Sequence, residues 1–117
     1  MKRQRDPPPM FFARLEPASS DMKVSFNPWA ERELNDAAQY YELESPGLGA
    51  AFLSEVERAC TAITEYPEAA PVVLGSIRRR LLRRFPYALL YRLRPDVVRV
   101  LAVMNLKRRP TYWVARA

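Results

Sequence analysis

The sequence contains no histidine and a single cysteine, Cys60. Without imidazole, the Ser-His-Asp and Cys-His arrangements that use it as the base near neutral pH are excluded. One cysteine cannot form a disulfide within the chain, and a zinc site would need carboxylates, alone or together with the thiolate. We therefore expect no metal and no cofactor, and any catalysis would have to use Arg, Lys, Tyr or carboxylate side chains.

Long apolar runs are also absent. No stretch approaches the roughly 20 apolar residues that span a bilayer, and the opening MKRQRDPPPM lacks the apolar segment of a signal peptide. We expect a soluble cytoplasmic protein with no membrane partner. With 117 residues, 49% of them hydrophobic, the chain is long enough for one packed domain and too short for two of ordinary size.

Acidic residues are nearly missing from the C-terminal part of the chain. Residues 75–117 contain twelve Lys and Arg and one acid, Asp96, whereas residues 28–68 contain nine acids and only two bases, Arg32 and Arg58. The net charge of +6 is therefore divided into an acidic and a basic part. A basic surface of this kind predicts a polyanionic or acidic partner.

Residues 1–21 contain the run PPP followed by FFARLEPASSD, with no sustained periodicity. This composition predicts a flexible extension, and Met22 is an alternative start of the protein. A second interpretation is that Phe11 and Phe12 pack against the domain. We take residues 22–117 as the single domain.

Two helices are predicted in the acidic part. Asn27 before Pro28 is typical of a helix start, and the first helix should run to about Glu44. The Ser-Pro-Gly break at residues 45–47 is followed by a second helix that ends before Pro67. On each helix the apolar residues recur on one face: Ala30, Leu34, Ala37, Ala38 and Tyr41 on the first, and Leu48, Phe52, Val56, Ala59 and Ile63 on the second. The two helices should form an antiparallel hairpin.

Four segments have the composition of strands, at residues 22–26, 76–82, 87–94 and 97–104. Their order around the helices, β-α-α-β-β-β with short connections, predicts an α+β fold. In this fold the helical hairpin packs on one face of a mostly antiparallel sheet of three to four strands. We expect the opposite face to be open.

Three parts of the sequence form a recognisable set: NPWAERELNDAAQYYELESPGLGAAFLSEVE, RRRLLRRFPYALLYR and LKRRPTYWVAR. Together they resemble the RelE/ParE superfamily of toxins from type II toxin-antitoxin systems, and the resemblance covers residues 22–116. It implies the RelE/ParE-like fold and a chain that inhibits growth until a cognate antitoxin neutralises it. The superfamily includes gyrase poisons and ribosome-dependent mRNA endonucleases on the same fold, so the site must decide the target.

The nuclease branch would use clustered cations and a tyrosine, without metal, to stabilise phosphate charge. The resemblance makes six residues candidates for that catalysis: Arg78, Arg80, Arg83, Lys107, Arg109 and Tyr112. Alternation along a strand should place Arg78 and Arg80 on one face. However, the central-strand position expected to hold an arginine falls on Ala88, and Trp113 competes with Tyr112 for the place of the tyrosine.

The segments RRFPY and RRPTYW favour the ParE branch. We therefore predict a toxin that binds DNA gyrase without chemistry of its own. The alternative is a metal-independent, ribosome-dependent mRNA endonuclease, whose partners would be the ribosome and mRNA.

Other interpretations of the same residues stay open. The arginines of residues 78–80 and 83–84 are either the solvated side of an edge strand or a surface for an acidic antitoxin. Tyr112 and Trp113 are as well suited to pin the C-terminal segment against the sheet, and Cys60 to be a small buried residue. The remaining regularly spaced aromatic residues should be core: Tyr40, Tyr41, Phe52, Phe85, Tyr87 and Tyr91.

Overall fold

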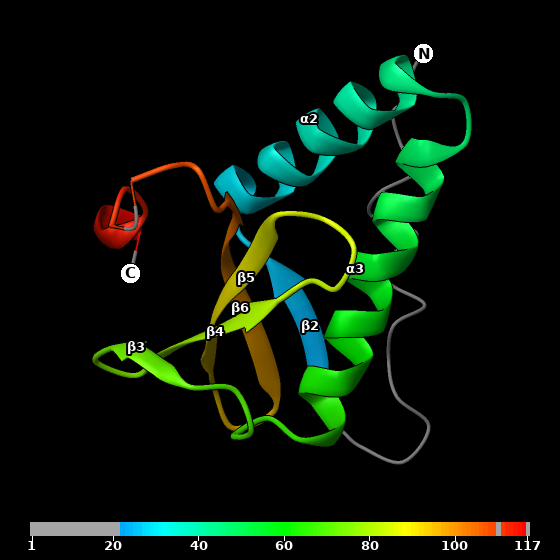
Figure 1. The fold of residues 1–117 in the computed structure, drawn as a ribbon. Coiled ribbons are helices and arrows are strands. Elements are labelled where there is room, and N and C mark those ends of the chain that lie inside the picture. The colour runs from blue at the N-terminus through cyan, green and yellow to red at the C-terminus, as the bar shows by residue number, and fades with distance from the viewer. Residues whose placement is uncertain (1–21, 110, 117) are drawn as a thin grey trace.

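The computed structural model describes residues 22–109 and 111–116 (Figure 1). The predicted extension, residues 1–21, lies outside the described residues, so it stays a prediction. In chain order the elements are β2 (Lys23–Phe26), α2 (Pro28–Glu44), α3 (Leu48–Glu65), β3 (Val72–Leu74), β4 (Ile77–Leu81), β5 (Tyr87–Leu93), β6 (Val97–Asn105) and the 3₁₀ turn η1 (Val114–Arg116). No helix within these residues is long and apolar enough to cross a membrane.

The helical hairpin forms where the sequence predicted it. The side-chain oxygen of Asn27 accepts a hydrogen bond of 2.7 Å from the backbone N–H of Ala30 and so caps α2. At the turn, Gly47 has a φ of 88°, a conformation that favours glycine. A Cβ at Gly49 would lie 2.5 Å from the carbonyl oxygen of Ala38. Only glycine therefore permits the close approach of α3 to α2.

Within the described residues the sheet has five strands in the order β2-β6-β5-β4-β3, with β2 parallel to β6 and the other neighbours antiparallel. The predicted three to four strands were one too few, because β3 lies in the segment that we expected to be a connection. This strand is only three residues long and is followed by Gly75, whose φ of 55° turns the chain back into β4. Three residues are too few for an alternating pattern to be detected.

The hairpin covers one face of the sheet, and the main core lies between them (Figure 1). Phe52 is fully buried, and its ring lies 5.2 Å from that of Phe85 and 5.1 Å from that of Tyr87. Tyr91 is also fully buried, as predicted. Tyr40 is not, since it is 56% exposed at the edge of this cluster. Its position on α2 directs it to the side of the buried stripe, so the prediction that it is core was wrong.

Cys60 is fully buried in the same core. Burial raises the pKa of its thiol, because the thiolate would lose its hydration, and Glu57 adds to this effect. The thiol therefore behaves as a small apolar group, as the sequence predicted.

A bulge in β6 changes which side chains face the helices. The residues of β6 paired with β5 step from Ala102 to Val100, which leaves Leu101 without a partner. As a result Val100 and Val103 face the helices, while Leu101 and Ala102 both face away. Strict alternation, as expected from the sequence, does not hold across this point.

The face of the sheet away from the helices is partly covered, which corrects our expectation that it is open. Trp113, only 2% exposed, packs there on a second apolar cluster. The cluster consists of Ile77, Ala88, Leu90, Leu101, Ala102 and Met104. The interpretation that Trp113 pins the C-terminal segment against the sheet is thus confirmed.

Candidate functional site

One edge of β6 is only half covered by its neighbour. The last residue of β2, Phe26, is paired with Val100, and Asn27 donates its backbone N–H to the carbonyl of Val100. Beyond this point β2 has ended, so the backbone of β6 from Leu101 onward needs other partners. Unpaired buried backbone groups are costly, so something else must satisfy them.

Glu33 of α2 supplies one of those partners. Its Oε1 accepts a hydrogen bond of 2.9 Å from the backbone N–H of Val103. The side chain of Arg116 supplies another, because its Nη1 donates to the carbonyl oxygen of Leu101 at 3.3 Å. The bulge at Leu101 turns both backbone groups toward this edge.

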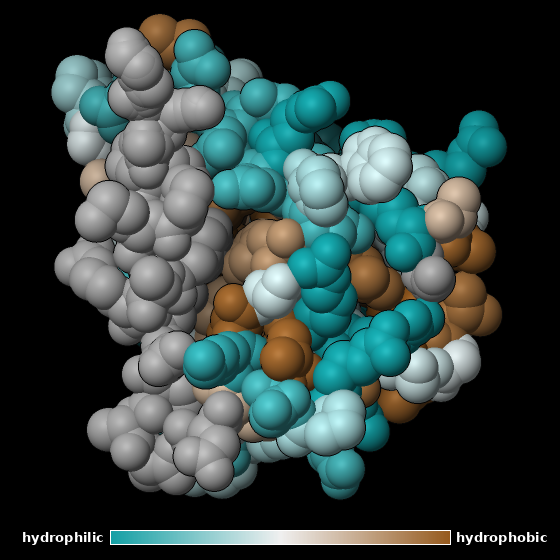
Figure 2. Space-filling model, turned by 180° about the vertical axis from the view of Figure 1, so that it is seen from behind, coloured by the Kyte–Doolittle hydropathy of each residue, from teal (hydrophilic) through white to brown (hydrophobic). Residues whose placement is uncertain are grey.

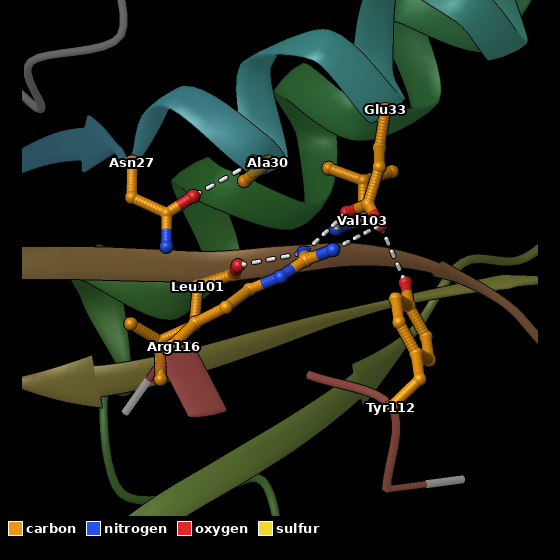
Figure 3. Close-up of polar contacts among 7 residues, drawn as sticks. All are labelled: Asn27, Ala30, Glu33, Leu101, Val103, Tyr112 and Arg116. Atoms are coloured by element: carbon orange, nitrogen blue, oxygen red, sulfur yellow. Dashed lines mark hydrogen bonds and ion pairs between the residues drawn. The ribbon is translucent and has the colours of Figure 1, made fainter. Parts of the chain in front are cut away.

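The same two side chains bind each other (Figure 3). Arg116 donates from Nη1 to Oε1 and from Nη2 to Oε2 of Glu33, each at 3.0 Å. The hydroxyl of Tyr112 donates to Oε2 at 2.8 Å. The side chains of Arg116 and Glu33 are only 14% and 17% exposed. Bidentate arginine-carboxylate pairs are directional, so this clamp of Glu33, Tyr112 and Arg116 holds the C-terminal segment to α2 and β6.

Tyr112 is held in its protonated form. Burial, its hydrogen bond to Glu33 and the negative charge of Glu33 raise its pKa, and the charges of Arg116 and Arg108 only partly oppose this. The guanidinium of Arg108 lies 3.8 Å from the centre of the Tyr112 ring. One face of the ring is therefore covered by the guanidinium of Arg108, and the hydroxyl donates its hydrogen bond to Glu33.

Two hollows border these elements. A groove of about 320 Å³ lies beside the clamp, between α2 and the ends of β5 and β6, and is lined by Glu33, Asp36, Tyr40, Tyr87, Asn105 and Arg108. A smaller hollow of about 160 Å³ lies between α3 and β4, where Arg80 and Arg83 face Arg58 and Glu55. Among residues 22–109 and 111–116 no group of three or more acidic or thiol side chains could hold a metal ion.

Comparison with known proteins places this architecture in a family. A family model described as the ParE toxin of the type II toxin-antitoxin system parDE matches residues 24–110. The chain belongs to the ParE toxin family. A solved structure described as the chromosomal ParDE TA system from P. aeruginosa has a TM-score of 0.65, with 13% identity over 74% of this chain and 97% of that chain. At that identity the likeness concerns the fold alone. No curated protein sequence matches this chain.

In this ParE-family chain three of the six predicted site residues, Arg78, Arg80 and Tyr112, are divided between the two sides of the sheet. Arg78 pairs with Tyr91 and Arg80 with Leu89, and both of those partners face the helices. Arg78 and Arg80 therefore share one face, as expected, but it is the helix-covered face. Tyr112 packs on the opposite cluster.

The side chain of Arg78 forms hydrogen bonds with the backbone. It donates from Nη1 to the carbonyl oxygens of Ala70 at 2.7 Å and Glu68 at 3.0 Å. It thereby holds the connection after α3 against the sheet. Arg83, Lys107 and Arg109 are exposed, the last two in the segment that follows β6.

Ala88, where the nuclease pattern expects an arginine, is fully buried in the cluster under Trp113. No cation of the central strand therefore reaches the neighbourhood of Tyr112 from this position. Whether any of the six candidates takes part in catalysis remains a prediction.

Glu33 and Arg116 were not predicted as site residues from the sequence. A signal for Glu33 was present, because it lies three residues after buried Ala30 and four before buried Ala37, and so falls on the core side of α2. A carboxylate inside an apolar stripe requires a buried partner. The partner lies 83 residues away, so nothing near Glu33 in the sequence identified it.

Proposed function

We propose that this chain inhibits growth by binding DNA gyrase, without chemistry of its own, and that a cognate antitoxin neutralises it. Membership of the ParE toxin family supports the toxin role and the existence of an antitoxin. The fold alone does not select the target, since one fold can carry several activities. The choice of gyrase therefore rests on what the site can do.

The single observation that carries the choice is the state of Tyr112. A tyrosine transfers a proton most efficiently when the pKa of its hydroxyl lies near the working pH. Here the hydroxyl donates to Glu33, and the pKa of Tyr112 is raised. Together with Ala88 in place of an arginine, this favours a binding protein over a nuclease.

The test is a supercoiling assay with purified gyrase, relaxed plasmid and increasing amounts of the full-length chain. We expect supercoiling to be lost as the toxin is added. Full gyrase activity at excess toxin would refute the proposal. Tyr112→Phe, shown to be folded by circular dichroism, is the matched variant, and it should inhibit gyrase as strongly as the parent.

Ribosome-dependent mRNA cleavage is the second candidate. It is favoured by the cations around Tyr112, with Arg108 over the ring and with Lys107 and Arg109 exposed in the same segment. This mechanism predicts that Arg83→Ala and Tyr112→Phe each abolish toxicity while folding is retained. Induced expression in growing bacteria separates the candidates: degraded messages indicate the nuclease, whereas intact messages with filaments and an SOS response indicate gyrase.

Neutralisation is tested by co-expression with the adjacent small gene. We expect growth to be restored and the two proteins to co-purify. Continued growth arrest with both proteins present would count against this gene as the antitoxin.

A further inference from the structure

Three arginines gather on the sheet face away from the helices. Arg92 of β5 is paired directly with Arg99 of β6, and it also faces Ile77 of β4. Arg79 lies two residues beyond Ile77 on the same side of β4, and it is paired with Leu90 of the apolar cluster on that face. We call Arg79, Arg92 and Arg99 the arginine face.

This arrangement is unfavourable for the isolated chain. Like charges directly opposite each other on neighbouring strands are destabilising. In the part of the chain that the structure describes, no carboxylate forms an ion pair with any of the three. Among the described residues, the hydroxyl of Ser25 is the one side-chain hydrogen-bond partner of the three, and Arg99 donates to it.

Unsatisfied donors are concentrated on the same face. Within the described residues, three buried side-chain nitrogens have no hydrogen-bond partner: the Nε atoms of Arg79 and Arg92 and the Nε1 of Trp113. Trp113 packs on the apolar cluster of this face. Buried donors without acceptors are rare and costly in folded proteins. Three of them on one face make this face energetically unfavourable in the isolated chain.

Apolar side chains lie among these cations. Leu81 follows Arg79 by two residues on the same side of β4 and is 54% exposed, and Leu74, paired with Ile77, is 47% exposed. Hydrophobic side chains are also visible at the right-hand edge of Figure 2, the side on which β3 and the C-terminal segment lie. Positively charged and apolar side chains are thus interspersed on this surface.

This mixture fits a peptide better than a nucleic acid. Binding of single-stranded nucleic acid uses exposed aromatic rings on which bases stack. Trp113 is only 2% exposed, and the Tyr112 ring is covered by Arg108. An extended segment that alternates acidic and apolar side chains would match both the arginines and the leucines.

We propose that the arginine face binds an extended acidic segment of a partner polypeptide, whose carboxylates accept hydrogen bonds from Arg79, Arg92 and Arg99. The proposed function supplies such a partner in the antitoxin, and to that extent this inference rests on it. Charge complementarity would speed association and select the correct partner.

The probe is a short fluorescent peptide in which glutamate alternates with valine, titrated with the full-length chain and followed by anisotropy. A lysine-valine peptide and a single-stranded oligodeoxynucleotide are the comparison ligands. Arg92→Gln and Arg99→Gln are the test variants. Arg32→Gln, an exposed position on α2, is the matched control.

We expect the acidic peptide to bind, the lysine peptide not to bind, and each test variant to weaken binding by roughly tenfold. Arg32→Gln should bind like the parent, and binding should weaken as salt is added. Thermal unfolding shows whether each variant is still folded, and we expect every variant to unfold cooperatively well above the temperature of the binding assay.

Three results would overturn the proposal: no binding of the acidic peptide, equal loss in Arg32→Gln, or tighter binding of the oligodeoxynucleotide with the same dependence on Arg92 and Arg99. The assay needs neither gyrase nor antitoxin. Peptide binding by a chain that fails to inhibit growth would therefore refute the proposed function and leave this inference intact.

Discussion

On the face of the sheet that meets the helices, Arg78 donates to the carbonyl oxygens of Glu68 and Ala70. On the opposite face, the Nε atoms of Arg79 and Arg92 are buried without a partner among the described residues. Arg78 and Arg79 are neighbours in one run of the sequence, yet alternation along β4 gives them different surroundings. One arginine run therefore contains both a cation that binds the backbone and a cation whose Nε has no partner, and the elements that cover each face determine the difference.

The helix-covered face should carry most of the stability. Phe52→Ala removes a fully buried ring that packs on Phe85 and Tyr87, and we expect the free energy of unfolding to fall by about 3–5 kcal/mol. Urea denaturation measures the change. Leu81→Ala on the opposite face is the control, and at 54% exposure it should change stability by less than about 0.5 kcal/mol. Comparable losses in both would remove the distinction between the faces.

The clamp at the edge of β6 joins the two faces, and it should give the next largest effect. Glu33→Ala leaves Arg116, Tyr112 and the N–H of Val103 without their acceptor. With allowance for partial exposure, we expect a loss of about 2 kcal/mol. Glu44→Gln, exposed at the end of α2, should be neutral.

The same Glu33→Ala variant has a spectroscopic signature. In a Trp29→Phe background Trp113 is the only tryptophan. If the clamp holds the C-terminal segment, its removal should shift the Trp113 emission to longer wavelength. An unchanged emission would mean that the apolar packing of Trp113 is sufficient by itself.

Tyr112→Phe should give a smaller loss that depends on pH. At neutral pH the missing hydrogen bond to Glu33 should lower the free energy of unfolding by about 1 kcal/mol. Because the folded-state pKa of Tyr112 lies above its ordinary value of 10.0, its contribution is complete below pH 10 and declines as the pH rises toward the folded-state pKa. Above pH 10, stability should therefore fall more steeply in the parent than in the variant. Parallel curves from alkaline denaturation would contradict this.

Arg92→Thr should have the smallest effect, and one of opposite sign. It removes one of two like charges that face each other across β5 and β6, so we expect a gain of about 0.5 kcal/mol in the free energy of unfolding. Thermal unfolding at low salt measures it, and high salt should reduce the gain. A loss would show that the aliphatic part of Arg92 packs on the sheet and outweighs the repulsion.

The predicted elements agree best with the structure where a local pattern was long. Both helices have the predicted bounds. The cap at Asn27 and the break before Leu48 could be read from the sequence because each acts on its immediate neighbours. The strands β5 and β6 lie within one residue of their predicted bounds. Among the elements of residues 22–109 and 111–116, only β3, which is three residues long, was missed.

The candidate site was less predictable. The sequence grouped Tyr112 with Arg78 and Arg80 as candidates for one catalysis, but the sheet separates Tyr112 from these two arginines. Residue types alone cannot show whether a cation on a strand faces the helices, because the sequence does not show which face of the sheet the helices cover. Glu33 and Arg116, which fix the position of Tyr112, were not recognised at all.

By itself the sequence determined the helical hairpin, the two longest strands, the division into acidic and basic parts and the resemblance that the family match confirms. These features depend on residues a few positions apart, so periodicity and capping reveal them. Only the tertiary structure decided that Glu33 binds Arg116. It also decided that the bulge at Leu101 changes which side chains of β6 face the helices, and that the three residues of the arginine face lie on one side of the sheet. The physical reason is that each of these depends on pairing between distant segments, and a shift of one residue in that pairing moves a side chain to the other side of the sheet.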